Sequence, residues 1–184
     1  AIARELDARD PPGPVAIGAP YVNYWHPWNA VNLALALRRD DLDVRWFNPA
    51  GGWVWSTDGK PTTYYFPTDP LGPQVIDPAL QDLFLSDAQM VSASDSFTTF
   101  RIDPAAALEA RLEEARNAPL AWPPDLQHLS APALPLTFAD RFALLGAEME
   151  DPMVRPGDQL RLLAYWEVLA ADPSPVVAFV HLTS

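Results

Sequence analysis

Two short apolar runs separated by a helical pattern constrain the fold more than any other feature of this sequence. The first run, "VAIG" at residues 15–18, is bounded by proline and glycine, as expected for an inner strand covered on both faces. Between it and "DVRWF" at 43–47, residues 28–37 are apolar almost all round, which predicts a helix buried against a sheet. Strand, helix and strand within about 30 residues predict a right-handed unit whose two strands are adjacent and parallel.

Further patterns predict that this unit belongs to a larger domain. In chain order they are a short helix at 1–10, strands at 51–55 and 62–67 joined by a hairpin turn at 57–60, helical turns at 78–85, a strand at 96–102, and a helix from Asp103 to about Arg116. We therefore expect an α/β fold, in which residues 1–116 form a small, mostly parallel, three-layer and Rossmann-like domain.

The last third of the chain has the pattern of antiparallel strands. In "MVRPGDQLRLLAYWEV", residues 155–158 fit a type II turn, because proline presets φ at the second position and glycine accepts a positive φ at the third. From Leu160 to Val168 the even-numbered residues are apolar and the odd-numbered residues are mixed. This period of two predicts a half-buried strand.

A proline-rich connector at residues 117–135 marks the predicted domain boundary. Residues 136–184 are then expected to form an antiparallel β-sandwich-like module. This segment has room for three or four strands, whereas a sandwich usually has about seven strands and about 100 residues. We therefore expect the module to be incomplete and truncated. The chain also does not begin with methionine, so we expect a mature product or an excised part of a longer protein.

Composition excludes several classes of partner and site. The formal net charge of −12 predicts that the surface repels nucleic acids and anionic membranes. The chain has no cysteine, which excludes disulfides, thiolate metal ligands and cysteine nucleophiles. No apolar run approaches the roughly 20 residues that a membrane-spanning helix needs.

The densest group of aromatic and amide side chains, "YVNYWHPWN" at residues 21–29, is the candidate binding site. It follows a predicted strand and precedes a predicted helix, where open α/β sheets bind ligands. Aromatic faces with nearby amides suit sugar rings, but the simpler interpretation is that these rings are packing anchors. The candidate ligand-binding residues are Tyr21, Asn23, Tyr24, Trp25, His26, Trp28 and Asn29.

The other motifs give no catalytic residue, metal site or cofactor. "GAPYVNYW" has one glycine where a dinucleotide-binding loop needs three. Asp41 and Asp43 could hold a divalent metal, but a solvated loop explains this carboxylate pair as well. Glu148, Glu150 and Asp151 could imitate a glycosidase pair, but Glu148 and Glu150 alternate to one strand face, the ordinary solvent face. The three histidines lack ligand spacing, and there is no G-x-S-x-G elbow.

The run "FADRFALLGAEMEDPMVRPGDQLRLLAYWEVLA", followed by "PSPVVAFVHL", resembles the soluble C-terminal region of bacterial polytopic membrane glycosyltransferases. These are dolichyl-phosphate-mannose-protein mannosyltransferase-like proteins, glycosyltransferase family 39 and its relatives. The upstream "HPWNAVNLALALRRDDLDVRWF" resembles the α/β part of such proteins.

The resemblance implies an extracytoplasmic accessory region, tethered to the membrane-embedded transferase portion of the same polypeptide. That portion would use a polyprenyl-phosphate sugar donor, and the accessory region would contact a glycan or a glycosylation acceptor. The catalytic loop of the resembled enzymes has no counterpart in this chain, so no catalytic residue is carried over. A free-standing exported carbohydrate-binding protein remains the alternative, and a soluble hydrolase lacks the motifs that it would need.

Overall fold

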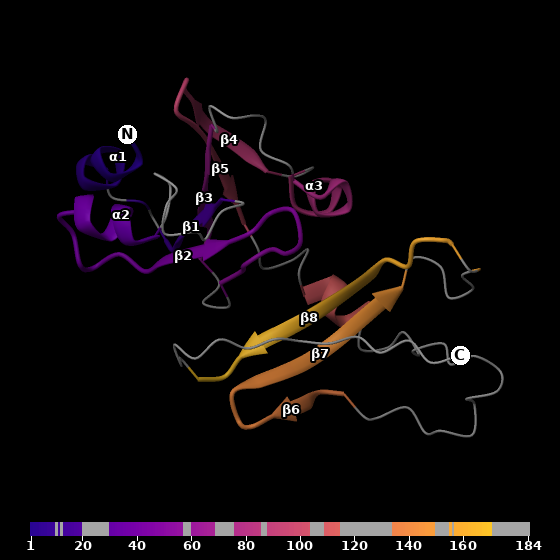
Figure 1. Ribbon diagram of the computed structural model, residues 1–184. Helices are drawn as coiled ribbons and strands as arrows, with labels where there is room; N and C mark the ends of the chain where they lie inside the picture. Colours follow the sequence, from indigo (N-terminus) through magenta and orange to yellow (C-terminus); the bar gives the residue numbers. More distant parts are fainter. Residues whose placement is uncertain are drawn as a thin grey trace. The chain divides into compact units, whose positions relative to one another are not determined.

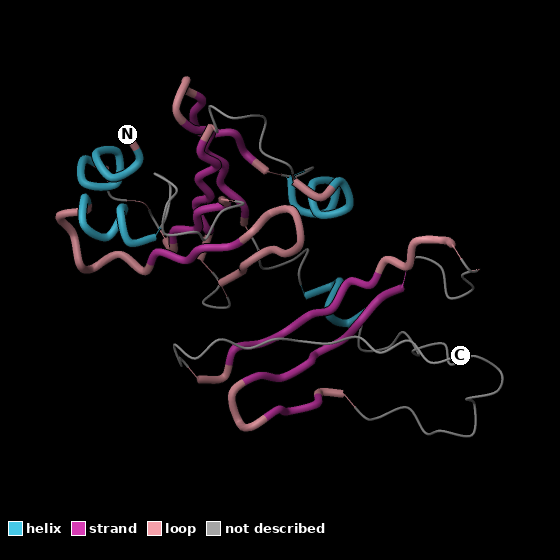
Figure 2. The backbone as a smooth tube through the Cα atoms, viewed as in Figure 1, coloured by secondary structure: helices cyan, strands magenta, loops and turns pink. Residues whose placement is uncertain are grey.

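The computed structural model divides into two compact units, Ala1–Ala107 and Leu108–Ser184 (Figure 1; Figure 2). It describes residues 1–9, 11, 13–19, 30–56, 60–68, 76–85, 88–103, 109–114, 134–149, 155 and 157–170. This division lies before the predicted connector at 117–135, and it leaves the helix at 109–114 in the second unit and outside the predicted domain of residues 1–116. The connector itself is described only from Leu134 onward.

The first unit contains a five-stranded sheet with the order β2-β1-β3-β5-β4. Its strands are β1 (Val15–Gly18), β2 (Val44–Phe47), β3 (Thr62–Pro67), β4 (Gln89–Ala93) and β5 (Phe97–Ile102). Strand β1 pairs in parallel with both β2 and β3, which confirms the predicted parallel unit.

The prediction of a mostly parallel sheet is wrong, because β5 pairs antiparallel with both β3 and β4. Strand β4 was not predicted. It is joined to β5 by a tight turn in which the Ser94 amide donates to the carbonyl oxygen of Phe97 over 2.9 Å. A connection this short permits only antiparallel neighbours. The β4–β5 register also shifts between Met90 and Ser92, which indicates a bulge at Val91.

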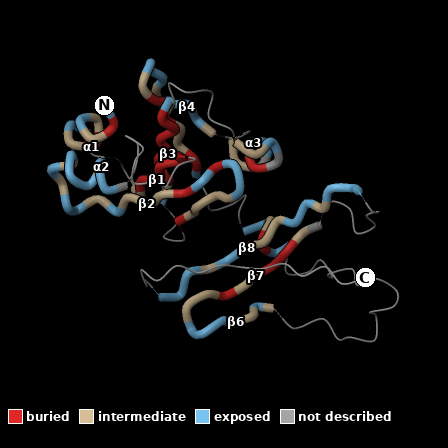
Figure 3. The backbone as a smooth tube through the Cα atoms, viewed as in Figure 1, coloured by how far each residue is buried: buried red, intermediate tan, exposed pale blue. Residues whose placement is uncertain are grey.

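Helices pack on both faces of this sheet. Helix α1 (Ile2–Ala8) buries Ile2 and Leu6 against Val15 and Ile17 of β1, and α2 (Ala30–Ala36) adds Leu33 to the same cluster. Helix α3 (Pro78–Leu85) contributes Phe84 and Leu85 to a second cluster around Ala16 and Tyr64. Side chains alternate along each strand, so consecutive residues of β1 supply the two clusters. Figure 3 shows the buried residues concentrated in β1 and β3.

The expectation that α2 is buried is wrong. Val31 is 47% exposed and Leu35 is 81% exposed, whereas Leu33 in the helix and Leu37 just after it pack on the core. Apolar residues on all sides of this helix therefore do not mean that all of its sides are buried.

Residues 51–55, predicted as a strand, form no strand. Trp53, Val54 and Trp55 pack on the second cluster, and two of their carbonyl groups accept hydrogen bonds from side chains. The Tyr64 hydroxyl donates to the carbonyl oxygen of Val54 over 2.9 Å, and Arg45 Nη1 donates to that of Trp55 over 3.1 Å. Because these acceptors are satisfied without a neighbouring strand, the segment needs no place in the sheet.

The second unit contains a three-stranded antiparallel sheet with the order β6-β7-β8. The strands are β6 (Leu136–Phe138), β7 (Phe142–Met149) and β8 (Leu162–Val168). The predicted turn precedes β8: the Asp158 amide donates to the Arg155 carbonyl oxygen over 2.9 Å, and Gly157 has φ +99°. The predicted strand in "VVAFVHL" lies outside the described residues, so the sandwich-like assignment stays a prediction.

One face of this second sheet is covered by a helix. Residues 109–114 are helical, as predicted for the described part of the segment from Asp103. Leu112 packs on Tyr165, with Leu145 and Leu163 around them. The face of β8 that carries Leu163, Tyr165 and Glu167 is therefore the covered face.

Candidate functional site

The carboxyl edge of β2, β1 and β3 is the candidate functional site. The connection after β1 leads to α2 on one face of the sheet, and the connection after β3 leads to α3 on the other face. Neighbouring parallel strands whose connections leave on opposite faces form a topological switch point, where open α/β sheets bind ligands. The structure thus provides the kind of edge that the sequence analysis expected after residues 15–18.

The predicted ligand-binding residues follow β1 directly in the chain. All of them lie outside the described residues: Tyr21, Asn23, Tyr24, Trp25, His26, Trp28 and Asn29. Their role in binding, and the alternative that they are packing anchors, therefore both stay predictions. The described residues that flank them are Ala19, at the end of β1, and Ala30, at the start of α2.

Aromatic rings close over the end of β1 on one face of the sheet. A Cβ atom on Gly18 would lie 2.7 Å from Cε1 of Phe66 and 3.0 Å from Cζ of Phe47. Both rings are buried, and they meet edge to face with centroids 6.1 Å apart. Trp53 packs on both of them, with centroid distances of 5.1 and 5.7 Å. This group was not predicted, because its three rings come from β2, from residues 51–55 and from β3.

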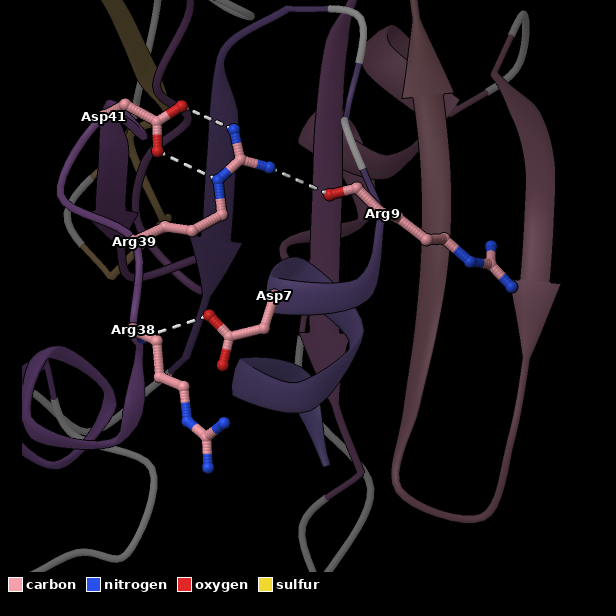
Figure 4. A network of polar contacts seen from close by, with 5 residues as sticks. All are labelled: Asp7, Arg9, Arg38, Arg39 and Asp41. Carbon is pink, nitrogen blue, oxygen red and sulfur yellow. Dashed lines mark hydrogen bonds and ion pairs between the residues drawn. The ribbon is translucent and has the colours of Figure 1, made fainter.

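A network of arginines and aspartates ties the end of α1 to the loop between α2 and β2 (Figure 4). The Arg39 side chain binds both carboxylate oxygens of Asp41, and its Nη1 donates to the carbonyl oxygen of Arg9 over 3.1 Å. The backbone amide of Arg38 donates to Oδ1 of Asp7 over 2.9 Å. The hydrogen bond from Arg39 lowers the pKa of Asp41.

This network replaces the metal-binding interpretation of the carboxylate pair with a structural one. Asp41 binds Arg39, and Asp43 accepts from Nη2 of Arg45 over 2.7 Å. Each carboxylate therefore has a cationic partner two residues away in the chain. Asp43 also precedes β2, which places it at the amino edge of the sheet, opposite the candidate site.

Glu148 lies on the covered face of the second sheet, which corrects the solvent-face interpretation. An extra residue, Leu145, is inserted between Leu144, which pairs with Trp166, and Gly146, which pairs with Tyr165. This bulge shifts the alternation of β7, so that Glu148 joins Tyr165. Glu150 and Asp151 lie outside the described residues.

Glu148 has two partners on that face. It accepts a hydrogen bond from the Tyr165 hydroxyl over 3.1 Å, and it lies 3.7 Å from Nη1 of Arg111. A carboxylate shared between a tyrosine and an arginine stabilises packing and is not arranged as the acid and base of a glycosidase.

Burial gives the protein a measurable alkaline sensitivity. Burial raises the pKa of Tyr64 to about 12, and burial followed by the charge of Glu148 raises that of Tyr165 to about 12. An unfolded tyrosine ionises near pH ~10, so folding favours the neutral form of both. This contribution to stability is complete below about pH 10 and is lost as the pH rises toward 12.

We therefore expect the urea concentration at the midpoint of unfolding to decrease as the pH rises from about 10 to about 12. Absorbance at 295 nm measures how far the tyrosine hydroxyls have ionised at each pH. Tyr64→Phe removes one titrating hydroxyl and should make the fall shallower. An unchanged pH dependence in Tyr64→Phe would contradict this assignment.

No family model, curated protein or solved structure matches this chain. Within the described residues, no helix is long and apolar enough to span a membrane. The same residues contain no group of three histidine, aspartate or glutamate side chains placed to hold a metal ion.

Proposed function

We propose that this chain is a non-catalytic accessory region of a membrane glycosyltransferase, acting on the extracytoplasmic side of a bacterial membrane. Its partners are a glycan or glycosylation acceptor and the membrane-embedded transferase portion of the same polypeptide. The resemblance of the two sequence blocks supports the tie to a polyprenyl-phosphate-dependent transferase. In this proposal the first unit is a Rossmann-like domain and the second a β-sandwich-like module.

The main support for glycan binding is the topological switch point at β1 and β3. An open edge of this type collects the loops that follow parallel strands, and the loop after β1 has the sequence "YVNYWHPWN". Indole and phenol rings present flat apolar faces that match the C–H face of a pyranose, while amide groups pair with hydroxyls. A neutral glycan also suits a chain with a net charge of −12, because it carries no charge to be repelled.

The proposal predicts a separation between binding and stability at Trp25. In Trp25→Ala the affinity for a neutral oligosaccharide should fall about tenfold, as for the loss of one aromatic anchor, with the melting temperature nearly unchanged. Isothermal titration with mannose, glucose and galactose oligosaccharides measures the first quantity, and calorimetry measures the second.

Trp166→Ala is the matched control, since it removes an exposed tryptophan from the second unit. It should leave glycan affinity unchanged. The proposal fails if none of the oligosaccharides binds, or if both variants weaken binding equally. A large drop in melting temperature in Trp25→Ala would identify the ring as a packing anchor.

A further inference from the structure

The face of the first sheet on which α1 packs carries a group of hydrogen-bonding side chains on β3, β5 and β4. Its members follow from the register, since residues directly opposite each other project from the same side of a sheet. Arg101 of β5 lies opposite Thr63 and Gln89. Thr99 of the same strand lies opposite Tyr65, which belongs to the cluster beneath α1. We call this group the polar patch, and it comprises Thr63, Gln89, Ser92, Thr99 and Arg101.

Arg101 has no acidic partner in the described part of the chain. Its side chain is half-buried, and its Nε atom is buried without a hydrogen-bond partner. By contrast, Arg9, Arg39 and Arg45 of the same unit each have a carboxylate partner. A charged group that is partly withdrawn from water loses hydration, and an ion of opposite charge offsets that loss. Arg101 is therefore placed to bind an anion from outside the described residues.

Thr99 adds a second hydrogen-bond donor beside Arg101. It is 2% exposed, and its hydroxyl oxygen is buried with no hydrogen-bond partner among the described residues. Buried hydroxyl groups are normally hydrogen-bonded, so an exception next to an unpaired arginine indicates a place for a bound group. Alternate residues of a strand lie about 7 Å apart on the same face. One oxyanion between these two side chains can accept hydrogen bonds from both.

A second guanidinium borders the polar patch. Arg9 lies at the end of α1, and in Figure 4 its side chain extends from there toward β5. Burial raises the pKa of Tyr65, the charge of Glu5 raises it further, and the charge of Arg9 lowers it. Both charged groups therefore lie near Tyr65, the residue opposite Thr99. Glu5 binds Arg9 over 2.8 Å, so these two charges offset each other and the patch keeps one positive charge.

We propose that the polar patch binds the oxyanion of a small soluble molecule, a phosphate or a carboxylate group. Arg101 supplies the charge and the Thr99 hydroxyl donates a hydrogen bond. Guanidinium groups form strong, directional hydrogen bonds with the oxygens of both kinds of anion. Arg101 lies opposite Thr63, near the start of β3, whereas the candidate glycan site lies at the carboxyl edge. Anion binding therefore does not depend on the proposed function.

An NMR titration of the full chain, followed at the backbone amides, tests this proposal. The probes are inorganic phosphate and acetate, added at neutral pH while sodium chloride keeps the ionic strength constant. We expect saturable shifts at the amides of Thr99 and Arg101, and the probe that binds more tightly identifies the kind of oxyanion. Arg101→Gln should lower the affinity at least about tenfold, because it removes the charge-assisted hydrogen bonds. Thr99→Val, which keeps the side-chain shape, should lower it about fivefold.

Arg4→Gln is the matched control, because it removes the same charge from an exposed residue of α1. It should bind both probes as the parent chain does. The proposal is overturned if neither probe gives saturable shifts in the polar patch, or if Arg4→Gln and Arg101→Gln lose affinity equally. Unchanged affinity in Thr99→Val also overturns it, and this variant decides the matter if Arg101→Gln folds poorly. Failure of glycan binding with intact anion binding would affect only the proposed function.

Discussion

Leu6→Ala should lower the free energy of unfolding of the first unit by about 3 kcal/mol, since truncating a buried leucine typically costs 2–5 kcal/mol. Leu6 has no solvent exposure and packs in one cluster with Ile2, Ile17 and Tyr65. Helix α1 has only seven residues, and a helix this short is not stable without tertiary contacts. Loss of the Leu6 side chain therefore weakens both the cluster and the helix.

Leu35→Ala is the matched control, because it makes the same change in α2 at a residue that is 81% exposed. Its effect should stay within about 0.5 kcal/mol. Urea unfolding followed by tryptophan fluorescence compares the two variants. Equal midpoints would contradict the packing of α1 on the sheet.

Gly18→Ala should destabilise the first unit by about 2 kcal/mol, the typical cost of overpacking a core. The added methyl group would lie 2.7 and 2.9 Å from two atoms of the Phe66 ring. Phe66 is 5% exposed and Phe47 is 6% exposed, so neither ring has solvent-facing space to move into. The strand would have to shift at the edge where the candidate site begins.

Gly51→Ala provides the control for this substitution, since no atom lies within 4 Å of its added methyl group. It should leave the urea midpoint unchanged or slightly raised, because alanine restricts the unfolded chain. Equal urea midpoints for Gly18→Ala and Gly51→Ala would contradict this prediction. They would show that the rings of Phe47 and Phe66 move aside with no loss of stability.

Local patterns in the sequence predicted the elements whose signal lies in a short stretch of the chain. "VAIG", "DVRWF" and the helical pattern between them predicted the parallel pairing of β1 with β2, because a helix between two neighbouring strands returns the chain to the edge where the first strand began. The turn at 155–158 was predictable because proline and glycine restrict φ at fixed positions. In both cases the signal lies within a few residues of the structure that it specifies.

The remaining features depend on contacts between distant segments. Residues 51–55 are rich in tryptophan and valine, as strands are, but Tyr64 and Arg45 occupy two of their carbonyl groups. The bulge at Leu145 exchanges the faces of β7 beyond it, and no local pattern marks it. Alternation alone therefore placed Glu148 on the wrong side of the sheet.

The candidate site was predictable only as a position in the fold. A loop after the first strand of an α/β unit lies at the carboxyl edge whatever its sequence, and the switch point at β1 and β3 agrees with that. The rings of Phe47, Phe66 and Trp53 come from three separate segments, so their packing beside Gly18 had no signature in any one of them.

The bulge in β4 has a consequence for how this chain behaves at high concentration. Strand β4 forms the edge of the five-stranded sheet, and Met90 and Val91 on it are 61% and 46% exposed. An apolar edge of this kind is a template on which a strand from another molecule can grow into a fibril. The register shift at Val91 interrupts the even spacing of amide and carbonyl groups that such a strand would need. We therefore expect the backbone geometry of this bulge to limit such growth, in a strand that carries no charged side chain.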